Sequence, residues 1–234
     1  MASPPAMRRQ RRADWTLMAA IHEALRRDLD ELLHPAASRP PARARWIAFR
    51  EQLRFHLAAE KAVVWPSARA RLTDNPRGQA LLDAMEDEQQ LIGPLLAVTD
   101  DAFTMDADPM RIRQLLARLR TRLTSHLAHK ESEALPLIWR IMSERELGRI
   151  TRAICGGRCL RQAARTVPWA LAHASPQIRD QVLSQFPAPA RVLHRKVWLP
   201  RYARTARPAG TSTRSAVYAS GYRDTSRCPV EGRP

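Results

Sequence analysis

The sequence is poor in glycine, cysteine and aromatic residues. Its 234 residues include eight Gly and three Cys, and 6% are aromatic, while apolar residues make up 44%. Few glycines and an ample apolar fraction favour an α-rich protein with a buried core. The cysteines, at positions 155, 159 and 228, have the spacing of neither a zinc site nor a thioredoxin-like motif. They indicate a reducing compartment, and we expect a cytoplasmic protein.

Long apolar runs are also absent. No stretch reaches the roughly 18–20 residues that a membrane-spanning helix needs. The N-terminus MASPPAMRRQRRADW is basic, but the apolar stretch after it is short and is interrupted by His22 and Glu23, unlike a signal peptide. Lysine is scarce as well, since only three of the 39 basic residues are Lys. This arginine bias is typical of GC-rich bacterial coding.

Charge is distributed unevenly along the chain. The formal net charge is +16, yet residues 13–150 carry 20 basic and 20 acidic groups. Residues 1–12 add four Arg, and residues 151–234 carry 15 basic groups against three acidic ones. The basic ends could attract nucleic acid or an anionic membrane. No nucleic-acid motif is recognisable, however, and we favour a solvated helical lid over either partner.

Three groups of helix-breaking residues divide the neutral region into four segments. The breakers are HPAASRPP at 34–41, TDNPRG at 73–78 and DDAFTMDADP at 100–109. In each segment the apolar residues recur in alternating steps of three and four, which is the buried seam of a bundle helix. The pattern predicts an all-α, up-down four-helix bundle.

Polar residues occupy seam positions where the pattern requires burial. They are His22 in the first segment, His56 and Glu60 in the second, Gln89 in the third and His126 in the fourth. A single buried His is usually a hydrogen-bonded structural residue. Burying an ionisable group costs on the order of several kcal/mol unless it is paired or binds a metal. Three His and one Glu on three inward faces therefore indicate a cation at the centre of the bundle.

The spacing becomes irregular after His126. The seam should continue four residues later, at Lys130, but the apolar pattern resumes from Glu131 instead. A single-turn π-bulge between positions 126 and 131 would bring His126 and Glu131 to the same inward face. The alternative is a kink caused by Pro136.

These residues resemble the hemerythrin family, the HHE cation-binding domains, over residues 14–145. That family is a four-helix bundle with a His on its first helix, His-x-x-x-Glu on the second, two ligands on the third and His-x-x-x-x-Asp/Glu on the fourth. The resemblance implies that non-haem iron is held here. The implied ligands are His22, His56, Glu60, His126 and Glu131.

The third segment departs from the family pattern. Gln89 stands where a His is expected, and Gly93 stands where the second ligand is expected. The resemblance then implies one iron held by the ligands of the first two helices together with Glu131, a set suited to Fe(II) or Mn(II). A second ion would keep only His126 and the bridging carboxylates. Whether one or two ions bind is left open.

The remaining chain is divided by composition. Residues 149–208 should form short basic helices near 157–173, 176–186 and 188–204, and residues 209–234 have a disordered composition. The expected organisation is a basic N-terminal arm (1–13), a hemerythrin-like bundle (14–148), a basic helical extension (149–208) and a disordered tail (209–234).

The resemblance implies a protein that binds or senses dioxygen, nitric oxide or peroxide at iron, a binding role more than an enzymatic one. Neither a nucleophile constellation nor a Gly-rich phosphate loop is visible. Because the third-segment ligands are missing, the alternative is a metal-free bundle. It would act as a regulatory or interaction module, with its basic extension contacting nucleic acid or membrane.

Overall fold

The computed structural model describes residues 4–34, 39–156 and 159–206. Within these residues all regular secondary structure is helical, which confirms the all-α prediction. None of the helices in this part of the chain combines the length and the apolar character that crossing a bilayer requires. The predicted disordered tail lies outside the described residues.

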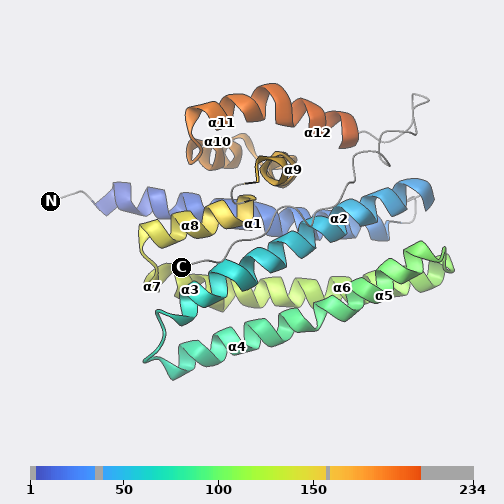
Figure 1. The fold of residues 1–234 in the computed structure, drawn as a ribbon, viewed down its shortest axis with the longest axis horizontal. Coiled ribbons are helices and arrows are strands. Elements are labelled where there is room, and N and C mark those ends of the chain that lie inside the picture. Colours follow the sequence, from blue (N-terminus) through green and yellow to red (C-terminus); the bar gives the residue numbers. More distant parts are fainter. Residues whose placement is uncertain (1–3, 35–38, 157–158, 207–234) are drawn as a thin grey trace. The chain divides into compact units, whose positions relative to one another are not determined.

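The helices follow one another through short connections (Figure 1). In three places an α-helix widens into a single π turn, labelled η, and then continues as the next α-helix. The elements are α1 (Pro4–Leu33), α2 (Arg39–Ala59), η1 (Glu60–Val64), α3 (Trp65–Arg69), α4 (Pro76–Gln90), α5 (Ile92–Thr104), α6 (Pro109–His129), η2 (Lys130–Ala134), α7 (Leu135–Ile141), α8 (Glu144–Cys155), α9 (Leu160–Leu171), α10 (Pro176–Ser184), α11 (Ala188–Leu193), η3 (His194–Trp198) and α12 (Leu199–Ala206).

The chain forms two compact units, residues 25–147 and residues 1–24 with 148–234. Helix α1 is continuous and runs from one unit into the other. In the unit 25–147, α5 packs along α6, and α4 contacts α6 and the π turn η2. The architecture is a helical bundle with a C-terminal helical extension, as predicted.

Seam positions of the predicted helices form the core of the unit 25–147. The side chains exposed by 1% or less include Trp46, Phe49, Leu53, Leu82, Met85, Leu116, Leu119 and Leu123. Trp46 also stacks on Phe103, with ring centroids 5.3 Å apart. Burial of such side chains, at about 1.5–3 kcal/mol each, is the main force that holds these helices together.

The sequence breakers become helix caps. Asn75 accepts a hydrogen bond from Gly78 N (2.9 Å) at the start of α4. Asp108 accepts one from Met110 N (2.8 Å) at the start of α6. Both helices then place a Pro in the first turn, where its missing N–H costs nothing. These caps fix where the third and fourth bundle segments begin.

The third bundle segment is interrupted in its middle. Helix α4 ends at Gln90 and α5 begins at Ile92. The cause is Pro94, which has no N–H to donate to the Gln90 carbonyl and whose ring clashes with it in a regular helix. The break lies between positions 89 and 93, where the resemblance noted in the sequence implies the third-helix ligands.

The three π turns share one sequence pattern. Each begins with a buried polar residue, namely Glu60, Lys130 or His194. Each is followed by Pro at the sixth residue after that polar one, at 66, 136 and 200. A helical Pro removes one N–H and clashes with the carbonyl four residues earlier, and widening the preceding turn relieves this conflict. The π turn and the effect of Pro136 are thus one feature, not alternatives.

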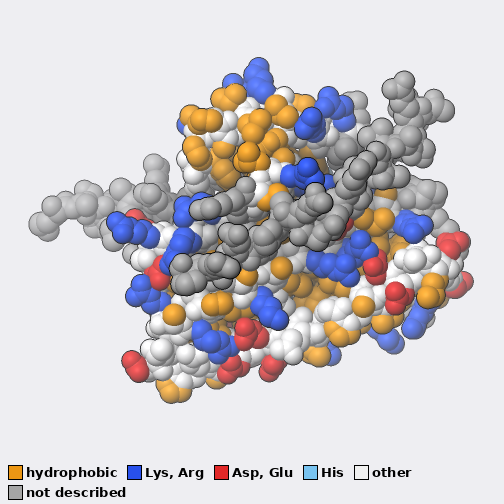
Figure 2. Space-filling model, viewed as in Figure 1, with side chains coloured by type: hydrophobic (Ala, Val, Ile, Leu, Met, Phe, Trp, Pro, Cys, Tyr) orange, Lys and Arg blue, Asp and Glu red, His pale blue; other side chains and the backbone are white. Residues whose placement is uncertain are grey.

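The extension forms helices close to the predicted ranges, in the unit of residues 1–24 and 148–234. Helix α9 contacts η3 and α12. Figure 2 shows apolar side chains gathered over α10, α11 and α12. The large apolar side chains exposed in this part of the chain are Leu160, Ile178, Val192 and Leu199.

Candidate metal centre

Four of the five polar seam residues are almost completely buried, and the fifth, Gln89, is half-buried. Exposure is 0% for His22 and Glu60, 2% for His56 and 1% for His126. The sequence reasoning is therefore confirmed on their burial. What each side chain meets there decides what the site can bind.

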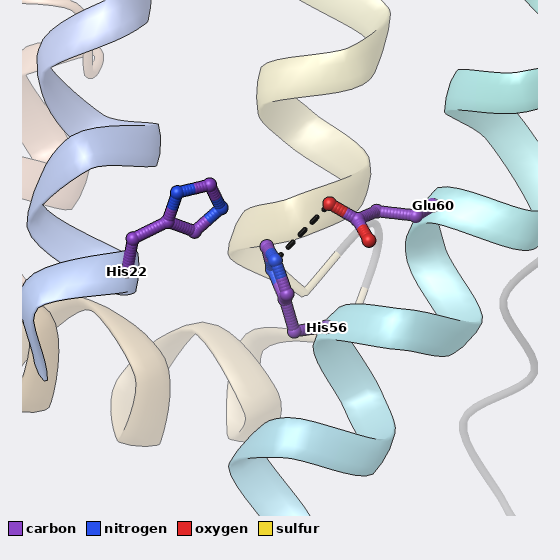
Figure 3. Close-up of side chains that lie close together, drawn as sticks. All are labelled: His22, His56 and Glu60. Atoms are coloured by element: carbon purple, nitrogen blue, oxygen red, sulfur yellow. Dashed lines mark ion pairs between the residues drawn. The ribbon is translucent and has the colours of Figure 1, made fainter. Parts of the chain in front are cut away.

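Three of the predicted ligands come together. One ligand atom each from His22, His56 and Glu60 lies within 4.8 Å of the others, and Figure 3 shows the three side chains directed towards one another. His22 comes from α1, whereas His56 and Glu60 lie one turn apart at the end of α2 and the start of η1. His56 Nε2 is 3.1 Å from Glu60 Oε1. Ligands about 2.1 Å from a shared ion are separated by up to ~4.2 Å, so small adjustments fit this cluster to a metal.

The Glu60 carboxylate has a second partner besides His56, and this partner is a lysine. Lys130 is fully buried, and its Nζ donates to both Glu60 oxygens at 2.8 Å. The same ammonium lies 5.8 Å from the centroid of the Trp65 ring, within the range of a cation–π contact. Glu60 is thus shared between His56 on its own helix and the ammonium of Lys130.

These neighbours keep Glu60 ionised. Burial acts to raise the pKa of its carboxyl, but the charges of His56 and Lys130, and the hydrogen bonds from both, outweigh burial. The resulting pKa of Glu60 lies well below the usual range for a glutamic acid. A buried carboxylate in this state is ready to bind a cation without first losing a proton.

His126 is held in the orientation of a metal ligand, although the three-residue cluster does not include it. Its Nδ1 is 3.0 Å from Glu88 Oε2, and the other oxygen of Glu88 is 2.7 Å from His129 Nδ1. Burial, with a contribution from the charge of Lys130, lowers the pKa of His126 to about 4. The ring is therefore neutral at pH 7. Its Nδ1–H donates to Glu88, and Nε2 keeps a lone pair that is buried without a hydrogen-bond partner.

Glu131 is not brought to the cluster, and this corrects the expectation that it faces inward. Its carboxylate pairs with Arg26 at 2.7 Å, and the side chain is 31% exposed. The reason is the position of the π turn, which spans Lys130–Ala134 and begins only after position 129. Regular α-helix therefore continues from His126 to Lys130, which keeps these two residues on one face.

The third bundle segment offers no ligand at the expected positions. Gln89 Oε1 accepts from Trp65 Nε1 at 3.0 Å, and its Nε2 donates to Leu57 O at 2.9 Å. Gly93 is exposed, and a Cβ built there meets nothing within 4 Å. Position 93 thus faces away from the core, and the Gln89 amide is already used to hold the indole that lies against Lys130.

Sequence reasoning missed the roles of Lys130 and Glu88. The signal for Lys130 was present, because it lies four residues after His126 on the seam and six before Pro136. Glu88 gave no signal, since it lies beside the seam residue Gln89 and reaches His126 through the length of its own side chain.

Comparison with known protein families gives a match over the bundle segment. The model of the hemerythrin HHE cation binding domain matches residues 14–138. No curated protein and no solved structure matches the chain. The matched segment is more than half of the chain and contains the buried cluster of His22, His56 and Glu60. The chain therefore belongs to the hemerythrin HHE cation-binding family.

Proposed function

We propose that this protein binds non-haem iron through His22, His56 and Glu60 and uses it to bind or sense a small ligand such as dioxygen, nitric oxide or peroxide. The observation that carries the proposal is the convergence of two imidazoles and one ionised carboxylate at a fully buried point. Two His and one carboxylate, with the remaining positions open, form a donor set typical of Fe(II). When bound, iron would supply reversible binding of small ligands or one-electron chemistry.

The protein's own residues prepare the site in two ways. Neighbouring apolar side chains such as Leu53 and Ala59 are completely buried, so they exclude water from the helix that carries His56 and Glu60. Lys130 and His56 together keep Glu60 charged in this dry setting. A site that is closed to bulk water favours small, weakly hydrated ligands over large substrates. This supports a binding or sensing role over hydrolysis of a large substrate.

A metal-free bundle is the second candidate, and one observation favours it. The ammonium of Lys130 already neutralises Glu60, so that carboxylate needs no metal to be tolerated in the core. In that case the protein would serve as an interaction module built on the same helices. The two candidates differ in whether iron is bound and whether its binding depends on His56.

Metal content decides between them. The wild type, His56→Ala and His173→Ala are each loaded anaerobically with Fe(II), desalted and measured by elemental analysis. His173 is an exposed His of the extension, so its replacement controls for loss of a histidine. We expect iron in the wild type and in His173→Ala, and a loss of at least tenfold in His56→Ala. Iron that is absent from the wild type, or unaffected by His56→Ala, would contradict the proposal.

A further inference from the structure

Lys130 is unusual among the basic residues of this chain. Of its three lysines, Lys61 and Lys196 are exposed, whereas Lys130 has no exposed surface. The other 36 basic residues are Arg. An Arg at position 130 would bring five donors in a planar fork, whereas an ammonium is a compact point charge with three donors. The basic residue buried in the core is thus a lysine, whose compact ammonium group resembles a bound metal ion more closely than a guanidinium does.

The surroundings of the ammonium are built to hold a positive charge. Both Glu60 oxygens accept from it at 2.8 Å, and the Trp65 ring lies 5.8 Å away. Trp65 is itself fixed by the hydrogen bond from its Nε1 to Gln89. Burying an ammonium costs on the order of several kcal/mol, which only such close partners offset. The position is therefore a formed cation site, filled by the chain itself.

A further side chain of the metal-ligand type, His126, precedes Lys130 by one helical turn. His126 is four residues from Lys130 on the same helix face. The positive charge of Lys130 contributes to lowering the pKa of the His126 imidazole. Its Nδ1–H is held by Glu88, and its Nε2 is buried without a hydrogen-bond partner. A carboxylate that orients the far side of an imidazole is the arrangement found behind metal-binding histidines. His126 thus has the environment of a metal-binding histidine, and it lies one helical turn from the ammonium that Glu60 binds.

We propose that the ammonium of Lys130 occupies the second of two adjoining cation positions that share Glu60, so that this protein binds one metal ion and not two. The inference rests on the proposed function, because it assumes that the first position takes a metal. Glu60 then has a metal ion on one side and a covalently tethered cation on the other. The ammonium cannot dissociate, and it repels a second divalent ion.

The test counts ions per chain in variants of position 130. Lys130→Glu exchanges the ammonium for a carboxylate, and Lys61→Met removes an exposed lysine next to Glu60 as the control. Each protein is titrated anaerobically with Fe(II), and the bound ions are counted by native mass spectrometry. We expect one ion in the wild type and in Lys61→Met, and two in Lys130→Glu. One ion in a folded Lys130→Glu protein would overturn the inference.

His126 supplies a second readout, and its measurement in the wild type does not depend on the folding of Lys130→Glu. In the wild type, His126→Ala should leave the single ion bound, because His126 is not part of the cluster of His22, His56 and Glu60. In the Lys130→Glu background the same change should reduce two ions to one. A wild type that binds two ions, or that loses its ion in His126→Ala, overturns the inference while the proposed function survives. A wild type without iron contradicts the proposed function as well.

Discussion

The ammonium of Lys130 donates to both carboxylate oxygens of Glu60 at 2.8 Å, and both side chains are completely buried. The pair joins the two π turns of the bundle, since each residue is the first of its turn. The same carboxylate lies 3.1 Å from His56 Nε2. Glu60 therefore links a candidate metal ligand to a fixed cation, and the stability and metal content of the protein should both depend on this link.

Breaking the pair from one side should destabilise the metal-free protein strongly. Lys130→Met leaves the Glu60 carboxylate buried without its ammonium, a loss of about 3–5 kcal/mol in the free energy of unfolding. The double variant Glu60→Gln with Lys130→Met should lose much less, because no buried charge is left unpaired. Urea unfolding in the presence of a chelator measures both. Equal losses in the single and double variants would show that the pairing is not the cause.

Iron should stabilise the native protein in a way that depends on His56. At a free Fe(II) concentration of 100 times Kd, the native state gains about 2.7 kcal/mol. Adding a chelator should therefore lower the Tm of the loaded wild type, whereas His56→Ala should show the same Tm with and without it. If the chelator leaves the Tm of the loaded wild type unchanged, the metal-free bundle would be supported.

Acid should remove a stabilising contact at the start of α8. Hydrogen bonds from the hydroxyl and backbone N–H of Ser143, with a contribution from Arg71, lower the pKa of Glu146 to about 2. A depressed folded-state pKa means that the stabilisation is present above the unfolded pKa of about 4.3 and is lost as pH falls towards 2. Glu146→Gln should thus cost on the order of 2 kcal/mol at pH 7 and nearly nothing at pH 2.

The exposed Glu144 in the same helical turn supplies the control. Glu144→Gln should change the free energy of unfolding by less than about 0.5 kcal/mol at either pH. Denaturant unfolding at a series of pH values measures both variants. A cost of Glu146→Gln that is the same at pH 7 and pH 2 would rule out the carboxylate charge as its source.

Two glycines of the third bundle segment should respond differently to alanine. Gly93 is exposed and a Cβ there meets nothing within 4 Å outside its chain neighbours. Because Pro94 follows it and disfavours a helical residue with a Cβ, Gly93→Ala should change the free energy of unfolding by less than about 0.5 kcal/mol. A Cβ at Gly78 would lie 2.8 Å from Leu72 Cδ2, so Gly78→Ala should destabilise. Gly93→His should leave the iron content unchanged, because the position faces away from the core. Extra iron in Gly93→His would show that this position faces the site after all.

Much of the fold could be predicted because its signals are local. The breakers at 34–41, 73–78 and 100–109 separate helices in the structure, and Asn75 and Asp108 become caps. The three-and-four spacing correctly identified the burial of His22, His56, Glu60 and His126, whereas Gln89 is half-buried and Glu131 does not face inward. Periodicity is informative here because a bundle helix has one inward face and every residue on it must be buried.

The details of the site could not be predicted in the same way. The five-residue step after His126 indicated a π turn, but spacing alone does not say on which side of position 130 the wide turn begins. A wide turn before position 130 would place Glu131 at the inward face, whereas the observed turn, which begins at 130, places Lys130 there. Likewise, the contact between Glu88 and His126 depends on side-chain reach between two helices, which no spacing within one helix encodes.

The most direct test of the metal centre is an anaerobic titration of the metal-free wild type with Fe(II), with the bound ions counted per chain. We predict that binding ends at one ion and that His56→Ala abolishes it, since the donors are His22, His56 and Glu60 with Lys130 filling the adjoining position. No binding would contradict a metal centre in this protein. Two ions would contradict the role given to Lys130.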